Sequence, residues 1–174
     1  MRILIVDDED AIREIIVEVF RDLFSEVCEA ANGYEALKHI KDKPFDLVIS
    51  DYHMPKMSGL DLLRICREEN IRVPMIWLSG RDNPELRTYA WQYGLFDYLE
   101  KPFDIEKLRE SVQSFLTLDP KIKQELFLDY TSPALQIPFE NVSKKITKVT
   151  YRTFIDWCLA QNEPMNEIIS KLLV

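Results

Sequence analysis

Five polar residues that can take part in chemistry stand at the C-terminal ends of short apolar segments. They are Asp7, Asp8, Asp51, Ser79 and Lys101. An unpaired acid is costly to bury at the end of an apolar strand, so each acid of this set needs a partner. Chance would scatter polar residues over both ends of the segments. Their shared position predicts that they meet at one edge of a folded sheet.

The three carboxylates of this set would repel one another if their segments became neighbouring strands. Repulsion makes such groups hard to ionise, and a nearby cation relieves it. Mg²⁺ binds through one or two carboxylates and keeps water and phosphate oxygens as its other ligands. Lys101 adds a point charge that can hold a phosphoryl oxygen, and Ser79 adds a hydroxyl donor. The combination predicts phosphoryl transfer to an aspartate, with Mg²⁺ or Mn²⁺ as the metal.

An alternation of strands and helices positions these residues. Strands are predicted at 3–6, 26–30, 46–50, 73–79 and 96–100, and helices at 10–24, within 31–40, and at 59–69, 84–93 and 104–116. The helices carry apolar residues at helical spacing, and Asp104 is a suitable N-cap for the last of them. Such alternation implies a parallel sheet covered by helices on both faces. Ligands of these sheets bind at the C-terminal strand ends, where the polar set stands.

Length and charge suggest two unequal parts. The chain has 174 residues and a net charge of −8. Residues 118–174 contain seven acids and seven bases, so residues 1–117 account for the whole net charge. An acidic chain is not expected to have a general affinity for nucleic acid or anionic membrane.

The chain is expected to be cytoplasmic. Its N-terminus lacks the long apolar region of a signal peptide, and no stretch approaches the ~18 apolar residues of a membrane span. Cys28, Cys66 and Cys158 are widely spaced and form no CxxC pair. They fit a reducing compartment and small apolar roles better than a disulfide frame or a zinc site.

Four stretches carry a family resemblance. "ILIVDDE", "LVISDYHMPKMSGLDLL", "MIWLSG" and "DYLEKPF" resemble the receiver domains of two-component response regulators, in the same order and over residues 1–117. The resemblance implies a flavodoxin-like doubly wound α/β fold, a five-stranded parallel sheet in the order 2-1-3-4-5. It also implies a signalling protein, whose only reactions are transfer of a phosphoryl group to its own aspartate and loss of that group.

The resemblance assigns roles to the acids. Asp51 would accept the phosphoryl group from a phosphohistidine of a sensor kinase or a phosphotransfer protein. Asp8 and Asp51 would bind Mg²⁺ directly, together with the backbone carbonyl of His53. Asp7 would act through a water molecule on the metal.

The resemblance also implies roles for residues that respond to phosphorylation of Asp51 or tune its rates. Ser79 would turn inward to bond the phosphoryl group, and Tyr98 would follow from an exposed to a buried position. Lys101 would contact the phosphoryl oxygens, and the Lys101–Pro102 peptide bond would be cis. His53 and Arg81 occupy positions that tune rates in the family. Two solvated loop residues are an equally good interpretation of that pair.

Each residue has an ordinary interpretation when taken alone. Asp7 or Asp8 could cap the first helix, and Asp51 could cap a loop. Ser79 could be a buried hydroxyl that is bonded to the backbone. Tyr98 could be an aromatic residue packed at the edge of the sheet, and Lys101 could be a solvated surface charge. Their joint occurrence in order favours the phosphoryl-transfer interpretation. The complete set also argues against a receiver that no longer takes phosphate.

Residues 118–174 are predicted to form a small all-α extension for interaction or dimerisation. The segment is rich in apolar residues and contains neither glycine nor histidine. The bases Lys144, Lys145, Lys148 and Arg152 share one face of a predicted helix. A transcriptional regulator with a minimal DNA-binding tail is the alternative, but a solvated face explains these bases more simply, so DNA is not an expected partner.

The chain is expected to pass its signal on through contacts with a downstream protein partner. Two homodimer surfaces are considered: that of the fourth helix, fifth strand and fifth helix, and the tail itself. Phe96 stands where the family often has a second acid, and it is expected to pack in the sheet and leave the pocket unchanged.

Overall fold

The computed structural model describes residues 1–80 and 95–118. Its strands are β1 (Arg2–Val6), β2 (Glu26–Ala30), β3 (Leu47–Asp51), β4 (Met75–Ser79) and β5 (Leu95–Glu100). Its helices are α1 (Asp10–Phe20), α2 (Gly33–Asp42), α3 (Gly59–Glu68) and α5 (Ile105–Thr117). The helix predicted at 84–93 and the predicted tail lie outside the described residues.

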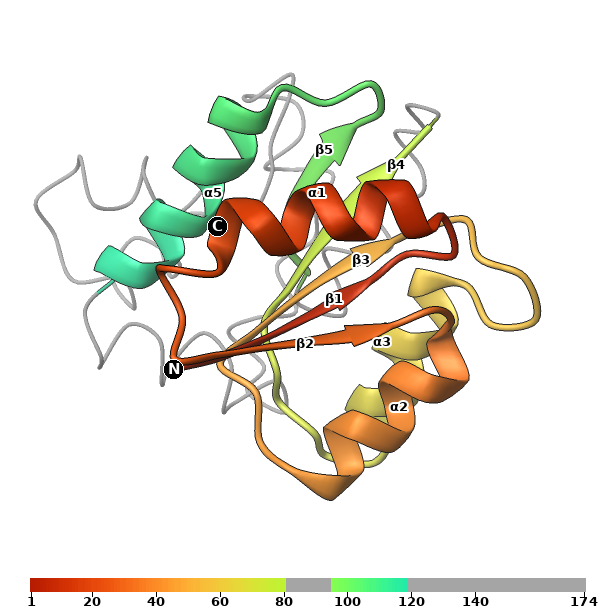
Figure 1. Cartoon of the computed structure of the whole chain (residues 1–174). Helices are drawn as coiled ribbons and strands as arrows, with labels where there is room; N and C mark the ends of the chain where they lie inside the picture. Colours follow the sequence, from red (N-terminus) through yellow and green to blue (C-terminus); the bar gives the residue numbers. More distant parts are fainter. Residues whose placement is uncertain (81–94, 119–174) are drawn as a thin grey trace, which may run out of the picture.

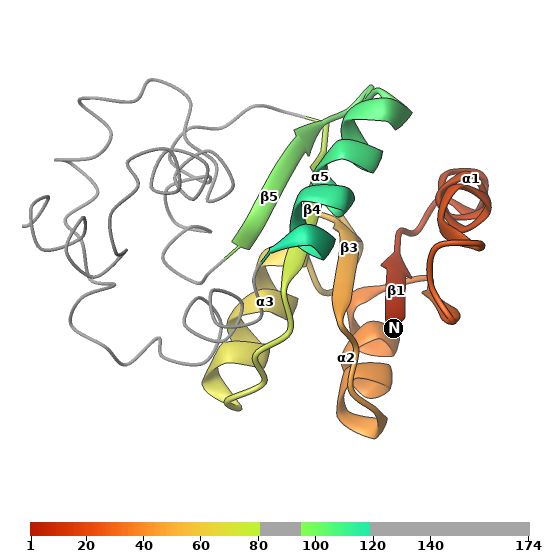
Figure 2. The ribbon, with the colours of Figure 1, turned by 90° about the vertical axis from the view of Figure 1, so that its left-hand side faces the viewer.

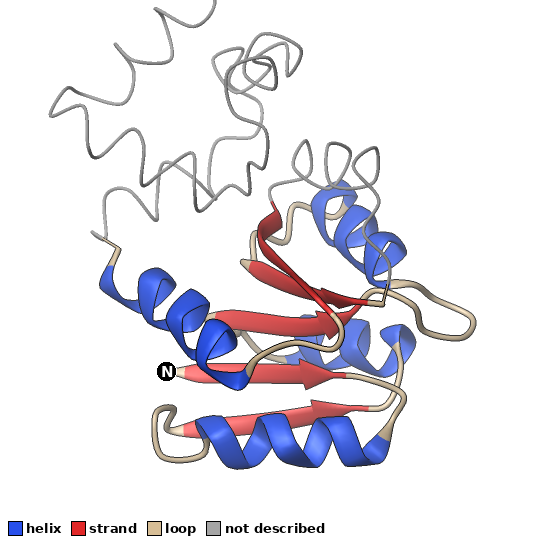
Figure 3. Ribbon diagram, turned by 90° about the horizontal axis from the view of Figure 1, so that it is seen from above, coloured by secondary structure: helices blue, strands red, loops and turns tan. Residues whose placement is uncertain are grey.

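The five strands form one parallel sheet in the order β2-β1-β3-β4-β5, as predicted. Figure 3 shows the neighbouring strands β2, β1 and β3 running in the same direction. Register brings Val6 of β1 opposite Ser50 of β3, and Asp51 opposite Leu78 of β4. The C-terminal ends of β1, β3 and β4 therefore meet at one edge of the sheet.

Helices cover both faces of the sheet. Figures 1 and 2 show α1 and α5 on one face and α2 and α3 on the other. Side chains alternate along β1, so that Ile3 and Ile5 join the core under α1 and α5, and Leu4 and Val6 join the core over α2 and α3. The two cores fix the register of the central strands, because a slip of one residue would exchange the faces.

Local signals set the helix boundaries. The Asp104 side chain accepts a hydrogen bond from the Glu106 amide at 2.9 Å, so the predicted N-cap of α5 is confirmed. Ser58 and Asp61 form a capping box at the start of α3. α1 ends at Phe20 instead of continuing to residue 24, because the chain turns there and Ser25 donates to the Met1 carbonyl.

Two further observations bear on the sequence analysis. Phe96 is 1% exposed and packs in the core under α5, as predicted. No helix within residues 1–80 and 95–118 is long and apolar enough to cross a membrane.

Candidate functional site

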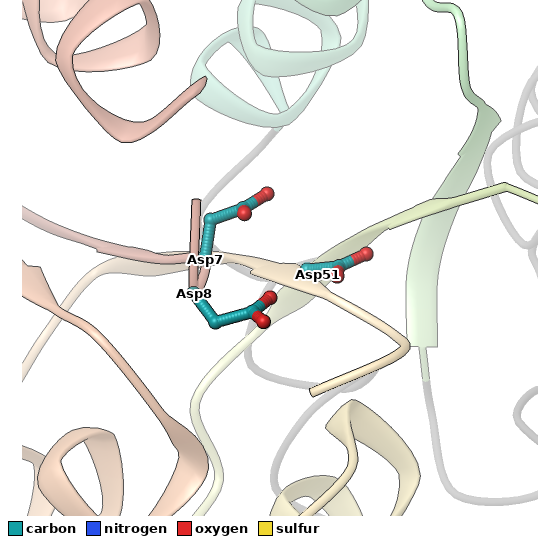
Figure 4. A group of neighbouring side chains, drawn as sticks. All are labelled: Asp7, Asp8 and Asp51. Atoms are coloured by element: carbon teal, nitrogen blue, oxygen red, sulfur yellow. The ribbon is translucent and has the colours of Figure 1, made fainter. Parts of the chain in front are cut away.

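Three carboxylates gather at the C-terminal edge of the sheet. Figure 4 shows Asp7 and Asp8 at the end of β1 and Asp51 at the end of the neighbouring β3. Each contributes an oxygen to a group whose members all lie within 4.8 Å of one another. Asp7 and Asp51 are buried, whereas Asp8 is exposed. The parallel pairing of β1 with β3 explains how acids 43 or more residues apart converge.

Lys101 supplies the positive charge of this site. Its Nζ lies 2.8 Å from Oδ2 of Asp7 and 3.3 Å from Oδ1 of Asp51. Burial opposes the charged form of Lys101, but the hydrogen bond to Asp7 and the charge of Asp51 outweigh it and raise the pKa of this ammonium. Lys101 therefore stays protonated and links the two buried acids.

The buried surroundings of Asp51 disfavour the ionised form of its carboxylate. Burial raises its pKa, the charge of Lys101 lowers it, and the charge of Asp7 raises it again, with a net rise above the usual 3.8. A backbone hydrogen bond from His53 also favours the ionised form. A poorly solvated carboxylate next to a cation has the character of an available nucleophile.

Ser79, one of the two predicted switch residues, lies next to the strand partner of Asp51. Ser79 is fully buried and directly follows Leu78, the residue that pairs with Asp51. Its carbonyl accepts a hydrogen bond from the Lys101 amide at 2.6 Å, which ties β4 to the residue before Pro102. The Lys101–Pro102 bond is cis, as the resemblance implied.

The other predicted positions differ in exposure. Tyr98 is half-buried on β5, and its backbone amide donates to Oδ1 of Asp97 at 2.8 Å. The His53 side chain is exposed, and its ring meets that of Tyr52 edge-on with centroids 4.5 Å apart. Arg81 lies outside the described residues.

The acidic group fits a small, hard cation. Two ligands of one Mg²⁺ stand at most about 4.2 Å apart, because each lies ~2.1 Å from the ion. An oxygen set spread over as much as 4.8 Å suits direct binding by one or two carboxylates, with a further acid acting through water. The donor set is all oxygen, which favours Mg²⁺ or Mn²⁺ over zinc.

Comparison with known proteins agrees with this geometry. A sequence model of the response regulator receiver domain matches residues 3–113. The chain belongs to the response regulator receiver domain family. It is 38% identical over 115 residues to chemotaxis protein CheY-3 of Vibrio cholerae, covering 64% of this chain and 88% of that protein.

Two further matches define the extent of the receiver domain. The chain is 37% identical over 123 residues to the regulatory protein AtoC of Escherichia coli, covering 71% of this chain but 27% of that protein. The receiver domain of the Francisella response regulator 1452 superimposes with a TM-score of 0.61 at 34% identity, covering 66% of this chain and 94% of that structure. The chain thus spans about a quarter of AtoC and most of CheY-3.

Neither Asp7 nor Asp8 caps the first helix, which was the alternative interpretation of these two acids. Glu9 is the N-cap of α1, and no side chain caps that helix end. Asp7 instead accepts from the Glu9 amide at 2.9 Å and from Lys101. Arg13, which was not among the predicted site residues, donates to the Asp7 carbonyl at 2.8 Å and fixes the backbone there. Its spacing from Asp10 suggests only a helix-surface ion pair, so the sequence carries no signal for this role.

Gly59 is a second position of the receiver site that was not predicted. Its amide donates to the Tyr52 carbonyl at 2.9 Å. A Cβ at this position would stand 2.6 Å from the Asp51 carbonyl oxygen and 3.1 Å from the Tyr52 Cα. Only glycine therefore lets the start of α3 approach the backbone that carries the nucleophile.

We expect Gly59→Ala to lower the free energy of unfolding by about 2 kcal/mol, because the added methyl group forces α3 away from Asp51. Urea unfolding at equilibrium measures this loss. Gly80→Ala is the matched control, since a Cβ at Gly80 meets no atom within 4 Å. It should change stability by no more than ~0.5 kcal/mol. Equal effects of the two variants would show that close approach at Gly59 is unimportant.

Proposed function

We propose that Asp51 accepts a phosphoryl group and that the chain works as a phosphorylation-controlled switch. One observation carries the proposal: a buried carboxylate at a strand end lies 3.3 Å from a lysine ammonium and within 4.8 Å of two further acids. This arrangement places a nucleophile, a cation and a set of metal ligands together. Those are the parts that phosphoryl transfer requires.

The reaction is a direct displacement at phosphorus. A carboxylate oxygen of Asp51 forms a bond to the phosphorus of a phosphohistidine or a small acyl phosphate. The bond from phosphorus to the donor breaks, and the leaving group keeps its electron pair and takes a proton from solvent. Lys101 holds a transferred oxygen by charge, and the Ser79 hydroxyl donates a hydrogen bond to another.

Asp8, Asp51 and the His53 carbonyl are the proposed ligands of Mg²⁺ or Mn²⁺, with Asp7 acting through water. When bound, the metal neutralises charge on the transferred group. The anionic phosphoryl donor can approach these acids only if their negative charge is neutralised. Lys101 does this for Asp7 and Asp51, and the exposed Asp8 depends on the metal.

The phosphorylated state acts through Ser79 and Tyr98 in this proposal. Ser79 is already buried, and Tyr98 lies half-buried on the neighbouring strand. Inward movement of Ser79 would open space for the Tyr98 ring and alter the surface around β5 and α5. His53 and Arg81 are proposed to influence the rates of uptake and loss.

The donor is proposed to be a sensor histidine kinase or a phosphotransfer protein, and the output a protein partner. The receiver domain is proposed to end at residue 117, with residues 118–174 as a separate interaction or dimerisation element. α5 ends at Thr117, which is compatible with that boundary. The chain is proposed to catalyse no reaction on other molecules.

We expect the full chain to gain one phosphoryl group when it is incubated with Mg²⁺ and acetyl phosphate. Mass spectrometry of the intact protein should show an adduct that is stable in acid and labile in base. Removing the metal with EDTA should abolish uptake. An adduct that forms equally well in EDTA, or that survives base, would contradict a metal-dependent aspartyl phosphate.

A further inference from the structure

A hollow lies between the C-terminal end of α1, with the turn that follows it, and the middle and C-terminal end of α5. It has a volume of about 710 Å³, and Val19, Leu23, Glu110 and Thr117 are among its lining residues. α1 and α5 begin shortly after the acids and Lys101, respectively, and run away from them. The hollow therefore lies at the end of the sheet opposite Asp51, and it plays no part in the proposed phosphoryl transfer.

One side of the hollow is apolar. Phe20 is fully buried in the core beneath it, whereas Val19 is half-buried and Leu23 is 48% exposed. Ile15, one turn before Val19 on α1, is 51% exposed. Single exposed apolar residues are ordinary, but Val19 and Leu23 in the wall of a hollow, with Ile15 one turn outside it, mark a surface suited to a partner.

The rim of the hollow is acidic. Its lining includes Glu18, Asp22 and Glu110 against a single base, Arg109. That base also lies 3.8 Å from Glu106, and Glu18 lies 3.0 Å from Arg21. Asp22 and Glu110 thus contribute most of the charge that an incoming segment would meet. The surface calls for a ligand with an apolar stripe and a basic edge.

Residues 142–152 of the same chain have that composition. The stretch "VSKKITKVTYR" contains four bases and no acid. Val142, Ile146 and Val149 recur at helical spacing beside Lys145 and Lys148. An amphipathic segment of this kind binds a groove through its apolar stripe, and its bases add charge complementarity.

The chain leaves the described domain next to the hollow. Thr117 lines the hollow and is the last residue of α5, and Leu118 packs against the core under α1 and α5. The 23 residues between Leu118 and Val142 can span up to roughly 75 Å, so reach does not limit docking. Attachment at this point also gives the segment a high effective concentration at the hollow.

We propose that residues 142–152 bind in the hollow between α1 and α5 of their own chain. The apolar stripe faces Val19 and Leu23, and the bases face Asp22 and Glu110. The extension is then held against the receiver domain at the end far from Asp51. This contact forms whether or not Asp51 takes a phosphoryl group.

Zero-length cross-linking of the full chain tests the contact. A carbodiimide joins a lysine amine to a carboxylate only where the two touch. We expect peptides that link Lys144, Lys145 or Lys148 to Glu18, Asp22 or Glu110. The pair Lys41 and Glu69, 2.7 Å apart on the other face of the sheet, serves as the internal positive control. If that control link forms and the links to the hollow do not, the proposal is wrong.

Isotope labelling separates docking within one chain from exchange between copies. In a mixture of ¹⁵N-labelled and unlabelled chains, docking within one chain gives links of a single isotope type. Links that join labelled to unlabelled peptides at the statistical frequency would assign the hollow to a second copy and overturn the proposal.

Charge reversal provides the variants. Asp22→Lys with Glu110→Lys should lower the yield of the links to Glu18 roughly tenfold, because the bases then meet like charge. Glu14→Lys, an exposed position of α1 outside the lining, should leave the yield unchanged. Adding Lys144→Glu and Lys148→Glu to the double reversal should restore links with inverted partners. A failure of restoration in folded protein would show that these charges do not meet.

Discussion

Asp51→Asn is expected to gain no phosphoryl group from acetyl phosphate under conditions in which the unchanged chain is phosphorylated. An amide oxygen is a poor nucleophile, and no other acid of the site combines burial with the position next to Ser79. Mass spectrometry of the intact protein measures the adduct. The same adduct at the same yield in the variant would remove Asp51 from the role of acceptor.

The same substitution has a second expected effect, on stability. The native pKa of Asp51 is raised, mainly by burial, so the fold disfavours its ionised form. The stability contribution of this group therefore falls as pH rises from the usual 3.8 through the native pKa. Asp51→Asn should accordingly have a higher Tm than the unchanged chain in EDTA at pH 7.

Magnesium should reverse that order. An ion that binds only the folded state adds about 1.4 kcal/mol at ten times its Kd. The unchanged chain should gain this, and Asp51→Asn should gain much less because a ligand is lost. Asp42→Asn, an exposed acid on α2, is the matched control and should behave like the unchanged chain in both uptake and Mg²⁺ response. An equal Mg²⁺ response in all three proteins would place the metal elsewhere.

The edge of the sheet could be predicted from the sequence because its signals are local and ordered. Four of the five strands end in or directly before a residue of the polar set, and the alternation with helices requires parallel strands whose C-terminal ends meet. The placement of Asp7, Asp8 and Asp51 at this edge follows from these two facts, but their convergence also needs the first and third strands to be neighbours. The strand order came from the family resemblance, since periodicity does not say which strands are neighbours.

The contacts that complete the site could not be predicted, because they depend on three-dimensional approach. Gly59 looks like an ordinary residue before a helix until a Cβ is placed 2.6 Å from the Asp51 carbonyl oxygen. Arg13 has helical spacing to Asp10, but its donation to the Asp7 carbonyl depends on how α1 leaves β1. The end of α1 was missed for a similar reason, because the turn after Phe20 is held by a hydrogen bond from Ser25 to the carbonyl of Met1, the residue before β1.

Lys101→Ala is expected to destabilise the metal-free protein by about 3 kcal/mol. The side chains of Asp7 and Asp51 are 1% and 7% exposed, so removal of the ammonium leaves two buried carboxylates without their cation. Mg²⁺ should recover more stability in this variant than in the unchanged chain, because metal and lysine neutralise the same acids. Urea unfolding with and without Mg²⁺ measures both effects.

Lys41→Ala makes the same chemical change in an exposed pair. Lys41 and Glu69 lie 2.7 Å apart, closer than Lys101 and Asp7 at 2.8 Å, but their side chains are 44% and 43% exposed. Solvent and salt screen such a pair, so the expected loss is at most ~0.5 kcal/mol and is unaffected by Mg²⁺. The contrast between the two lysines separates burial from distance as the source of the effect. If both variants lose the same stability, or if Mg²⁺ fails to favour Lys101→Ala, then Lys101 does not balance the charge of the acidic site.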